Sequence, residues 1–331
     1  MKKISYLVLV VLSGLTISAV SAIAFPEAEI GNGILHVRLY LPDSEKGYYR
    51  GSRFDWSGVM PVLEYKGHSY CGQWFEKYAP TTHDAIMGPV ESFSPLGYEG
   101  AGTGRGFVQI GVGLLARADG SPYSPFKYYK VLNPGAWKVE RSPDKVEFLH
   151  QLNDAAYSYA YKKAVQLLKG KPELVLTHSL KNTGKRVLET DVYDHNFFLI
   201  DHQPTGPGLV LRFPYRLTSE EARGLGQLAA IQGDSIVLLR QLVGEESVYA
   251  VLHGYGDQSS DYDIRLENHN TGAGLRITSD RPLSKLVYWG SPKTLCPEPY
   301  IHVTVQPGET FTWRIAYEFY TLQPHKLPIT N

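Results

Sequence analysis

The chain has 331 residues, 43% of them hydrophobic, and its 33 basic side chains are matched by 33 acidic ones. This length is sufficient for a large hydrophobic core. The balanced charge gives no bulk attraction to a phosphate backbone, so the composition does not support binding to nucleic acid.

The amino terminus has the pattern of a secretory signal peptide over residues 1–24. Two lysines precede a mostly apolar run at 6–20, and Ala22-Ile23-Ala24 places small residues where a signal peptidase cleaves. A membrane anchor is the alternative, but the apolar run is short for a bilayer span and ends in small residues. We therefore expect a periplasmic or secreted protein that starts at Phe25 and has no stable membrane insertion after signal removal.

Cleavage after residue 24 leaves residues 25–331, and no tract rich in Ser, Pro and Gly divides them. We expect one large domain, since single β-sandwiches and barrels often exceed the average domain length. The Gly-rich stretch Gly97–Gly106 is short and lacks the strand–helix context of a nucleotide-binding loop. It is either a loop at the mouth of a site or a plain connector.

Alternation of apolar and polar residues with a period of two dominates the remaining chain. It is clear at 34–42, at 157–168, where Lys163 interrupts the apolar face, and at 310–319. Turn signals separate such runs, among them Asn133-Pro134-Gly135, Asn182-Thr183-Gly184 and Gln306-Pro307-Gly308. These runs predict half-buried strands of an antiparallel kind.

Helical patterns are hard to find. Ser219 could cap a helix, but Gly224 and Gly226 soon weaken that helix. Many strands at short spacing with few helices predict an all-β fold, a large sandwich or barrel.

The chain has two cysteines, Cys71 and Cys296, too few for a disulfide framework. They could pair in an oxidising compartment, but their spacing does not show whether their Cα atoms come within about 7 Å. No CxxC, HExxH or clustered Cys/His motif has the spacing of a metal site. We therefore expect neither a metal nor an organic cofactor.

Polar residues interrupt two apolar strand patterns in the second half of the chain. The first is the segment 192–200, where His195 precedes two phenylalanines. The second is Cys296-Pro297-Glu298-Pro299, which follows an apolar run ending at Trp289. Taken alone, a histidine among aromatic residues is more often a hydrogen-bonded structural residue, and Glu298 could be a solvated loop acid.

The order of these pieces resembles the aldose 1-epimerase (galactose mutarotase-like) family. Its members run an L-x-N-T-G turn into a strand with a His before a Phe, and later have an apolar-Trp strand, a Glu followed by Pro or Thr, and a PGE turn. The matching pieces here are Leu180–Gly184, His195 with Phe197 and Phe198, Trp289, Glu298-Pro299 and Pro307-Gly308-Glu309. The resemblance covers roughly residues 140–320 and implies a β-supersandwich fold.

The resemblance also implies an activity, the interconversion of sugar anomers. That reaction removes the proton of the C1 hydroxyl and protonates the ring oxygen, so an acid and a base act at two points of one sugar. In the family a Glu is the base and a His the acid, which by motif are Glu298 and His195. Histidine suits the role because its pKa lies near neutral. The pKa of Glu298 would have to be raised, and shielding from water by the flanking prolines and Trp289 would raise it.

The first half of the chain fits the family less well. Arg53 is the candidate for the family's early arginine, and its guanidinium could bind sugar hydroxyls or a carboxylate through two hydrogen bonds. Equally, Arg50 and Arg53 could form a salt-bridged turn with Asp55. His83 is a loose match to a second family histidine.

Aromatic residues are abundant, with 23 Tyr and 5 Trp. Sugars pack their C–H faces on such rings, so Trp56 and Trp289 are candidate substrate-binding residues, with Trp74 near the same motifs. Most aromatic residues of a β-sandwich are instead core or cross-strand neighbours. Asp194 and Asn196 alternate to the strand face opposite a catalytic histidine, which indicates a structural role.

Three functions remain open, all with a sugar or oligosaccharide as partner. The first is an aldose 1-epimerase-like isomerase. The second is a polysaccharide lyase on the same fold, in which Arg53, His83, His195 and tyrosines would remove a proton beside a uronate carboxylate and stabilise that carboxylate. The third is a carbohydrate-binding module without turnover, which would tolerate the loss of Glu298.

Overall fold

The computed structural model describes residues 25–154 and 156–323, and the predicted signal peptide at 1–24 lies outside these described residues. The strands are β1 (Glu27–Gly31), β2 (Leu35–Tyr40), β3 (Val59–Tyr65), β4 (His68–Ser69), β5 (Gly88–Phe93), β6 (Gly106–Gln109), β7 (Gly113–Ala116), β8 (Val131–Asn133), β9 (Ala136–Ser142), β10 (Lys145–Leu152), β11 (Tyr159–Leu167), β12 (Glu173–Asn182), β13 (Leu188–Phe197), β14 (Leu209–Arg212), β15 (Thr218–Arg223), β16 (Ala229–Gln232), β17 (Ser235–Leu238), β18 (Val248–His253), β19 (Asp263–Asn268), β20 (Ala273–Ser279), β21 (Lys285–Ser291), β22 (Thr294–Val305) and β23 (Thr310–Thr321). Two short 3-10 helices, η1 (Ile200–His202) and η2 (Ser259–Asp261), complete the regular elements of this part of the chain. Within it, no helix has the length and apolar character needed to cross a membrane.

The alternating segments of the sequence are strands in the structure. Residues 34–42 contain β2, residues 157–168 contain β11, and residues 310–319 lie within β23. In β2 every second side chain is buried, because successive side chains of a strand point to opposite faces of its sheet. The prediction of an all-β, antiparallel fold is confirmed.

The helix start that the sequence offered at Ser219 is wrong. Residues 218–223 form β15, which pairs with β18 at the edge of a sheet. Every side chain of β15 is exposed, and the register shifts between Glu220 and Arg223. A polar segment without an apolar stripe has no face with which a helix could pack. The same segment can form an edge strand through its backbone hydrogen bonds.

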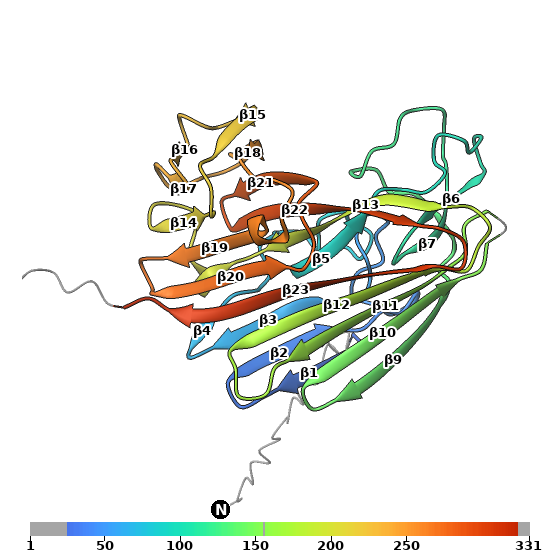
Figure 1. Ribbon diagram of the computed structural model, residues 1–331, viewed down its shortest axis with the longest axis horizontal. Helices are drawn as coiled ribbons and strands as arrows, with labels where there is room; N and C mark the ends of the chain where they lie inside the picture. Colours follow the sequence, from blue (N-terminus) through green and yellow to red (C-terminus); the bar gives the residue numbers. More distant parts are fainter. Residues whose placement is uncertain (1–24, 155, 324–331) are drawn as a thin grey trace, which may run out of the picture.

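Two large sheets form the sandwich (Figure 1). The ten-stranded sheet has the order β16-β17-β14-β19-β20-β23-β12-β11-β10-β9, and the six-stranded sheet has the order β15-β18-β21-β22-β13-β5. A four-stranded sheet, β1-β2-β3-β4, borders the six-stranded one, where the Met60 N–H on β3 donates to the Met87 carbonyl at 3.0 Å. A small sheet of β6, β7 and β8 lies at the opposite end of the molecule from β15 and β18 (Figure 1).

Apolar side chains from almost the whole described chain fill the sandwich, from Ala28 on β1 to Phe319 on β23. A second cluster, richer in aromatic rings, includes Phe54 and Trp74. Burial of this apolar surface is the main force that holds the sheets together. Cys71 belongs to the first cluster and Cys296 to the second, and both are free thiols.

Lys163, the charge that interrupts the apolar face of β11, lies buried between the sheets. Its Nζ contacts the carboxylate of Glu91, which comes from β5 in the opposite sheet. The other carboxylate oxygen of Glu91 lies 2.6 Å from Nε2 of His178, the cross-strand neighbour of Lys163 on β12. A buried ammonium group is tolerated when it is paired, so this triad explains the break in the pattern.

Candidate active site

His195 and Glu298 lie on neighbouring strands of the six-stranded sheet, β13 and β22. Along this pair Tyr193 faces Tyr300. Two residues further along β13 and two residues back along β22, the same antiparallel register places His195 opposite Glu298. Cross-strand neighbours share one face of a sheet, and Nε2 of His195 is 3.2 Å from Oε1 of Glu298.

Backbone pairing between β13 and β22 is interrupted beside this pair. On β22 it stops at Tyr300 and is found again at Leu295. Pro297 and Pro299 lie in the gap, and neither has an N–H group that would need a partner. The side chain of Asn196 joins the strands instead, because its Nδ2 donates to the carbonyl oxygen of Pro297 at 2.9 Å.

Asp194 and Asn196 point away from the site, as strand alternation predicts. The hydroxyl of Tyr317, on β23 of the opposite sheet, lies 2.8 Å from Oδ2 of Asp194 and 2.9 Å from Oδ1 of Asn196. Burial, with a further contribution from Glu91, raises the pKa of Asp194 well above its usual range. The Tyr317 hydroxyl is the donor to both oxygens, so its one proton is shared between Asp194 and Asn196.

Burial controls the charge of the candidate pair. The side chains of His195 and Glu298 are only 4% and 9% exposed. Burial raises the pKa of Glu298 to about 7, although the positive charge of Arg53 limits the rise. Burial and the same arginine hold the pKa of His195 well below its usual range. Near neutral pH the imidazole is therefore neutral, so the 3.2 Å approach of Nε2 to Oε1 of Glu298 is not an ion pair.

Arg53 faces the pair from the segment between β2 and β3. It is largely buried, and its Nη2 donates to the hydroxyl of Tyr193 at 3.0 Å. Its guanidinium lies 4.6 Å from the ring centroid of Phe54 and 5.1 Å from that of Phe126. The salt-bridged turn considered for Arg53 is not formed in the described residues, because Asp55 is buried in the core and its carboxylate accepts hydrogen bonds from its own turn.

A cavity of about 490 Å³ contains these groups. Its lining includes five of the six site residues proposed from the sequence, namely Arg53, His83, His195, Trp289 and Glu298. Trp56 is the exception, because its side chain is buried and its Nε1 donates to the Gly51 carbonyl at 2.8 Å. Among the residues that the structure describes, no three His, Cys, Asp or Glu side chains converge to hold a metal ion.

Aromatic stacking fixes the orientation of the imidazole. The ring of His195 stacks on Phe197 with 3.8 Å between centroids and 7° between planes. Phe197 in turn stacks on Trp74 at 5.1 Å and 10°. Trp289 meets His195 edge-on, at 5.8 Å and 73°. These rings also exclude water from one side of the pair, which contributes to the pKa shifts.

Sequence reasoning missed several lining residues of the cavity, which are Asp84, Pro125, Phe126, Tyr193, Arg223, Tyr249, Val287 and Tyr300. For Tyr193 and Tyr300 the sequence did contain a usable signal, which is their spacing from the candidate catalytic residues. Tyr193 and Tyr300 are each two residues from a candidate catalytic residue, so alternation places them on the same face, and their rings stack at 4.3 Å. Arg223 and Tyr249 come from β15 and β18, where no local pattern pointed to a site.

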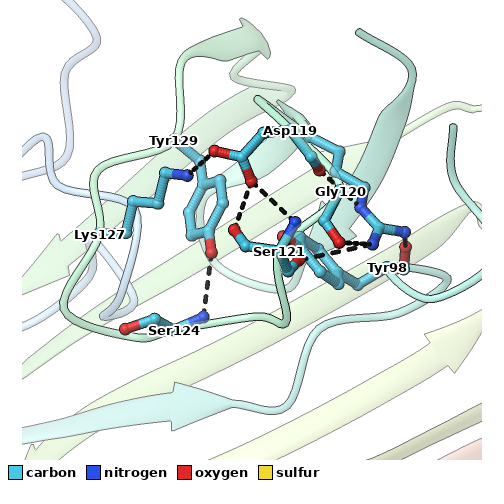
Figure 2. A network of polar contacts seen from close by, with 8 residues as sticks. Tyr98, Asp119, Gly120, Ser121, Ser124, Lys127 and Tyr129 are labelled. Atoms are coloured by element: carbon cyan, nitrogen blue, oxygen red, sulfur yellow. Dashed lines mark hydrogen bonds and ion pairs between the residues drawn. The ribbon is translucent and has the colours of Figure 1, made fainter. Parts of the chain in front are cut away.

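The loop between β7 and β8 brings Phe126 to the cavity, and Figure 2 shows the polar contacts within this loop. Asp119 accepts hydrogen bonds from Lys127 and from Ser121. The hydroxyl of Tyr129 accepts the N–H of residue 124 at 3.0 Å (Figure 2). These bonds tie the two sides of the loop together and so hold one wall of the site.

The Gly-rich stretch Gly97–Gly106 is a connector, not part of the cavity lining. Nη1 of Arg117 donates to the carbonyl oxygens of Tyr98 and Ala101, both at 2.9 Å. Arg117 therefore joins this stretch to the start of the loop that carries Phe126.

Solved structures of galactose mutarotase type have the same fold. A galactose mutarotase related enzyme from Lactobacillus acidophilus matches with a TM-score of 0.54 and 12% identity, over 91% of this chain and 100% of that chain. An aldose epimerase homologue from C. elegans matches with a TM-score of 0.53 and 14% identity, over 91% and 100% of the two chains. A galactose mutarotase-like protein from Lactobacillus casei gives 0.51 and 12%, over 89% and 100%. No protein-family model and no curated protein matches the sequence.

These similarities show that the chain has the galactose mutarotase-like fold, which confirms the fold resemblance drawn from the motif order. A shared fold at such low identity does not by itself assign an activity. The activity has to be argued from the site.

Proposed function

We propose that the chain is a sugar isomerase of the aldose 1-epimerase type. The observation that carries the proposal is the His195–Glu298 pair, which lines a ligand-sized cavity with 3.2 Å between Nε2 and Oε1. Opening an aldose ring requires a base at the C1 hydroxyl and a proton donor at the ring oxygen. Glu298, with its pKa raised to about 7, is suited to exchange a proton near neutral pH.

In the proposed reaction, the Glu298 carboxylate accepts the C1 hydroxyl proton as the bond between C1 and the ring oxygen breaks. The electron pair of that bond goes to the ring oxygen, which takes a proton from His195. Because the imidazole is neutral, it gives up its N–H proton only as negative charge develops on that oxygen. Rotation about the C1–C2 bond and the reverse steps then close the ring to the other anomer.

Anomer exchange followed by NMR on a panel of hexoses and uronic acids tests the proposal. We expect the wild type to exchange at least one sugar faster than buffer, and Glu298→Gln to be slower by about 100-fold or more. Glu27→Gln is the matched control, because Glu27 is exposed on β1 and outside the cavity lining. If the wild type exchanges no sugar faster than buffer, the isomerase proposal is excluded.

A polysaccharide lyase is the second candidate, because two arginines, Arg53 and Arg223, line the cavity. Guanidinium groups can neutralise a uronate carboxylate while a base removes the neighbouring proton. Uronate polymers would then gain the ultraviolet absorbance of a new conjugated double bond.

A binding module would instead keep its sugar affinity in Glu298→Ala and turn over no substrate.

We also propose that residues 1–24 direct export and that the working protein is periplasmic or secreted. The support is the basic start, the apolar run and the small residues at 22 and 24. Amino-terminal sequencing of the protein from its native cells should read from Phe25. A retained Met1 would contradict the proposal.

A further inference from the structure

A second cavity, of about 460 Å³, adjoins the first. The two cavities share Trp74, Asp84 and Trp289 in their linings, so they adjoin along these three residues. Each has a volume within the range of about 300–1,000 Å³ that is usual for small-molecule sites. The candidate catalytic pair lines the first cavity only, which leaves the second without a role in ring opening.

Two tryptophans line both cavities. The ring centroids of Trp74 and Trp289 are 5.6 Å apart, with 72° between the planes. Phe75 packs edge-on against Trp74 at 5.7 Å. Trp74 is buried, whereas Trp289 is partly exposed. An aromatic corner with one accessible ring offers the apolar surface on which the C–H face of a pyranose packs.

The rest of the second cavity is acidic. Its lining holds four carboxylates against one cation, and these residues are Glu76, Asp84, Glu245, Glu246 and Lys293. Lys293 lies 3.9 Å from Glu76. Carboxylates accept strong hydrogen bonds from hydroxyl groups, but they repel a ligand that carries a uronate or phosphate. The lining therefore matches a neutral, hydroxylated ligand.

Glu245 offers such a ligand an exposed carboxylate. Its neighbour Glu246 is already engaged, with Arg240 at 2.6 and 2.8 Å and with the N–H of Val243 at 3.0 Å. The side chain of Glu245 is exposed, and it has no ion-pair partner within the described part of the chain. Its oxygens are thus free to accept hydroxyl protons.

We propose that the second cavity binds the second sugar of a neutral oligosaccharide whose reducing end occupies the first cavity. The inference rests on the isomerase function proposed above, because only a reducing end has anomers to exchange. The reducing-end sugar lies against His195 and Glu298. The next sugar packs on Trp289 and donates hydroxyl hydrogen bonds to Glu245. The preferred substrate is then a short neutral oligosaccharide rather than a free hexose.

The test compares the disaccharides cellobiose, maltose, lactose and gentiobiose with glucose and galactose. Anomer exchange by NMR gives kcat/KM for the wild type, for Glu245→Ala and for the control Glu27→Ala. At least one disaccharide should exceed its monosaccharide by about tenfold in wild-type kcat/KM. Glu245→Ala should lower that value about fivefold to tenfold through KM, as expected for one lost charge-assisted hydrogen bond, and should affect the monosaccharide less.

The outcomes separate this inference from the isomerase proposal. Equal kcat/KM for disaccharides and monosaccharides, or an equal effect of Glu245→Ala on both, overturns the second sugar site and leaves the isomerase standing. A higher kcat/KM for digalacturonic acid than for galacturonic acid overturns the assignment of a neutral ligand. If no sugar exchanges its anomers, the isomerase proposal fails. Titration calorimetry with the same sugars then tests the second sugar site by binding alone. Tighter binding of a disaccharide that is lost in Glu245→Ala supports the site, and equal binding overturns it.

Discussion

At the scale of single residues, burial shifts the two members of the candidate pair in opposite directions. Burial always disfavours the charged form, so the pKa of Glu298 rises while that of His195 falls. The positive charge of Arg53 limits the rise at Glu298 and so keeps part of the carboxyl ionised near neutral pH. The site therefore has its carboxylate base and a neutral imidazole at the same pH.

This arrangement predicts the pH dependence of the reaction. We expect kcat/KM for anomer exchange to rise with pH, with an inflection at about 7, as Glu298 loses its proton and becomes a base. Because the pKa of His195 is depressed, the imidazole should add no second inflection near neutral pH. NMR exchange rates measured at low substrate concentration between about pH 5 and 9 check this. A rate that falls over that range would instead assign the proton donor to the imidazolium form.

The raised pKa of Glu298 also predicts an effect on stability. The pKa of Glu298 is about 7 in the folded chain against an ordinary value of 4.5. The contribution of Glu298 to the free energy of unfolding is therefore fully present below pH 4.5 and is lost as pH rises through 7. Glu298→Gln removes this titration. The quantity to compare is the free energy of unfolding of the variant minus that of the wild type. We expect this difference to be larger at pH 8 than at pH 4 by about 3 kcal/mol. Urea unfolding at both pH values measures the difference, and an equal change at both would contradict the shift.

At the scale of elements, the site depends on a gap in the pairing of β13 and β22. Pro297 and Pro299 on β22 have no N–H group that would need a partner in that gap, and the Asn196 side chain bridges it. The Tyr317 hydroxyl, from the opposite sheet, contacts both Asn196 and Asp194. Glu298 is thus held by the backbone pairing of β22 with β21 on one side, where it faces Val287, and by the Asn196 side chain on the β13 side.

Tyr317→Phe tests this link. Loss of the hydroxyl leaves buried groups of Asp194 and Asn196 without that partner, so we expect the free energy of unfolding to fall by about 1–3 kcal/mol. We also expect kcat for anomer exchange to fall with little change in KM, because Glu298 would be less well positioned. Tyr262→Phe is the matched control, since its buried hydroxyl has no partner among the described residues. Unchanged kcat in Tyr317→Phe would contradict the positioning role.

At the scale of the whole molecule, the Lys163–Glu91–His178 triad connects the two large sheets through the core. Lys163→Met leaves the Glu91 carboxylate buried without its cation, so we expect a loss of about 3–5 kcal/mol in the free energy of unfolding. The double variant Lys163→Met/Glu91→Leu removes both charges and should lose clearly less. Denaturant unfolding of the single and double variants measures both values. A double variant as unstable as the single one would contradict this account.

Much of the fold could be predicted from the sequence because strand alternation is a local property. The segments at 34–42, 157–168 and 310–319 each show a period of two, and each contains or forms a strand. The helix start at Ser219 was misleading. Capping residues indicate where a helix could begin, but they do not reveal that β18 is available as a pairing partner for this segment. The break at Lys163 was visible too, although its partner in the opposite sheet was not.

By itself the sequence determined that the chain is built of alternating strands, and its motif order singled out His195 and Glu298. Only the tertiary structure decided that these two side chains meet, that Trp56 packs away from the cavity, and that the two cysteines are unpaired. The physical reason is that alternation assigns a side chain to one face of its own strand. Register and sheet packing, which are set by distant segments, decide what that face meets.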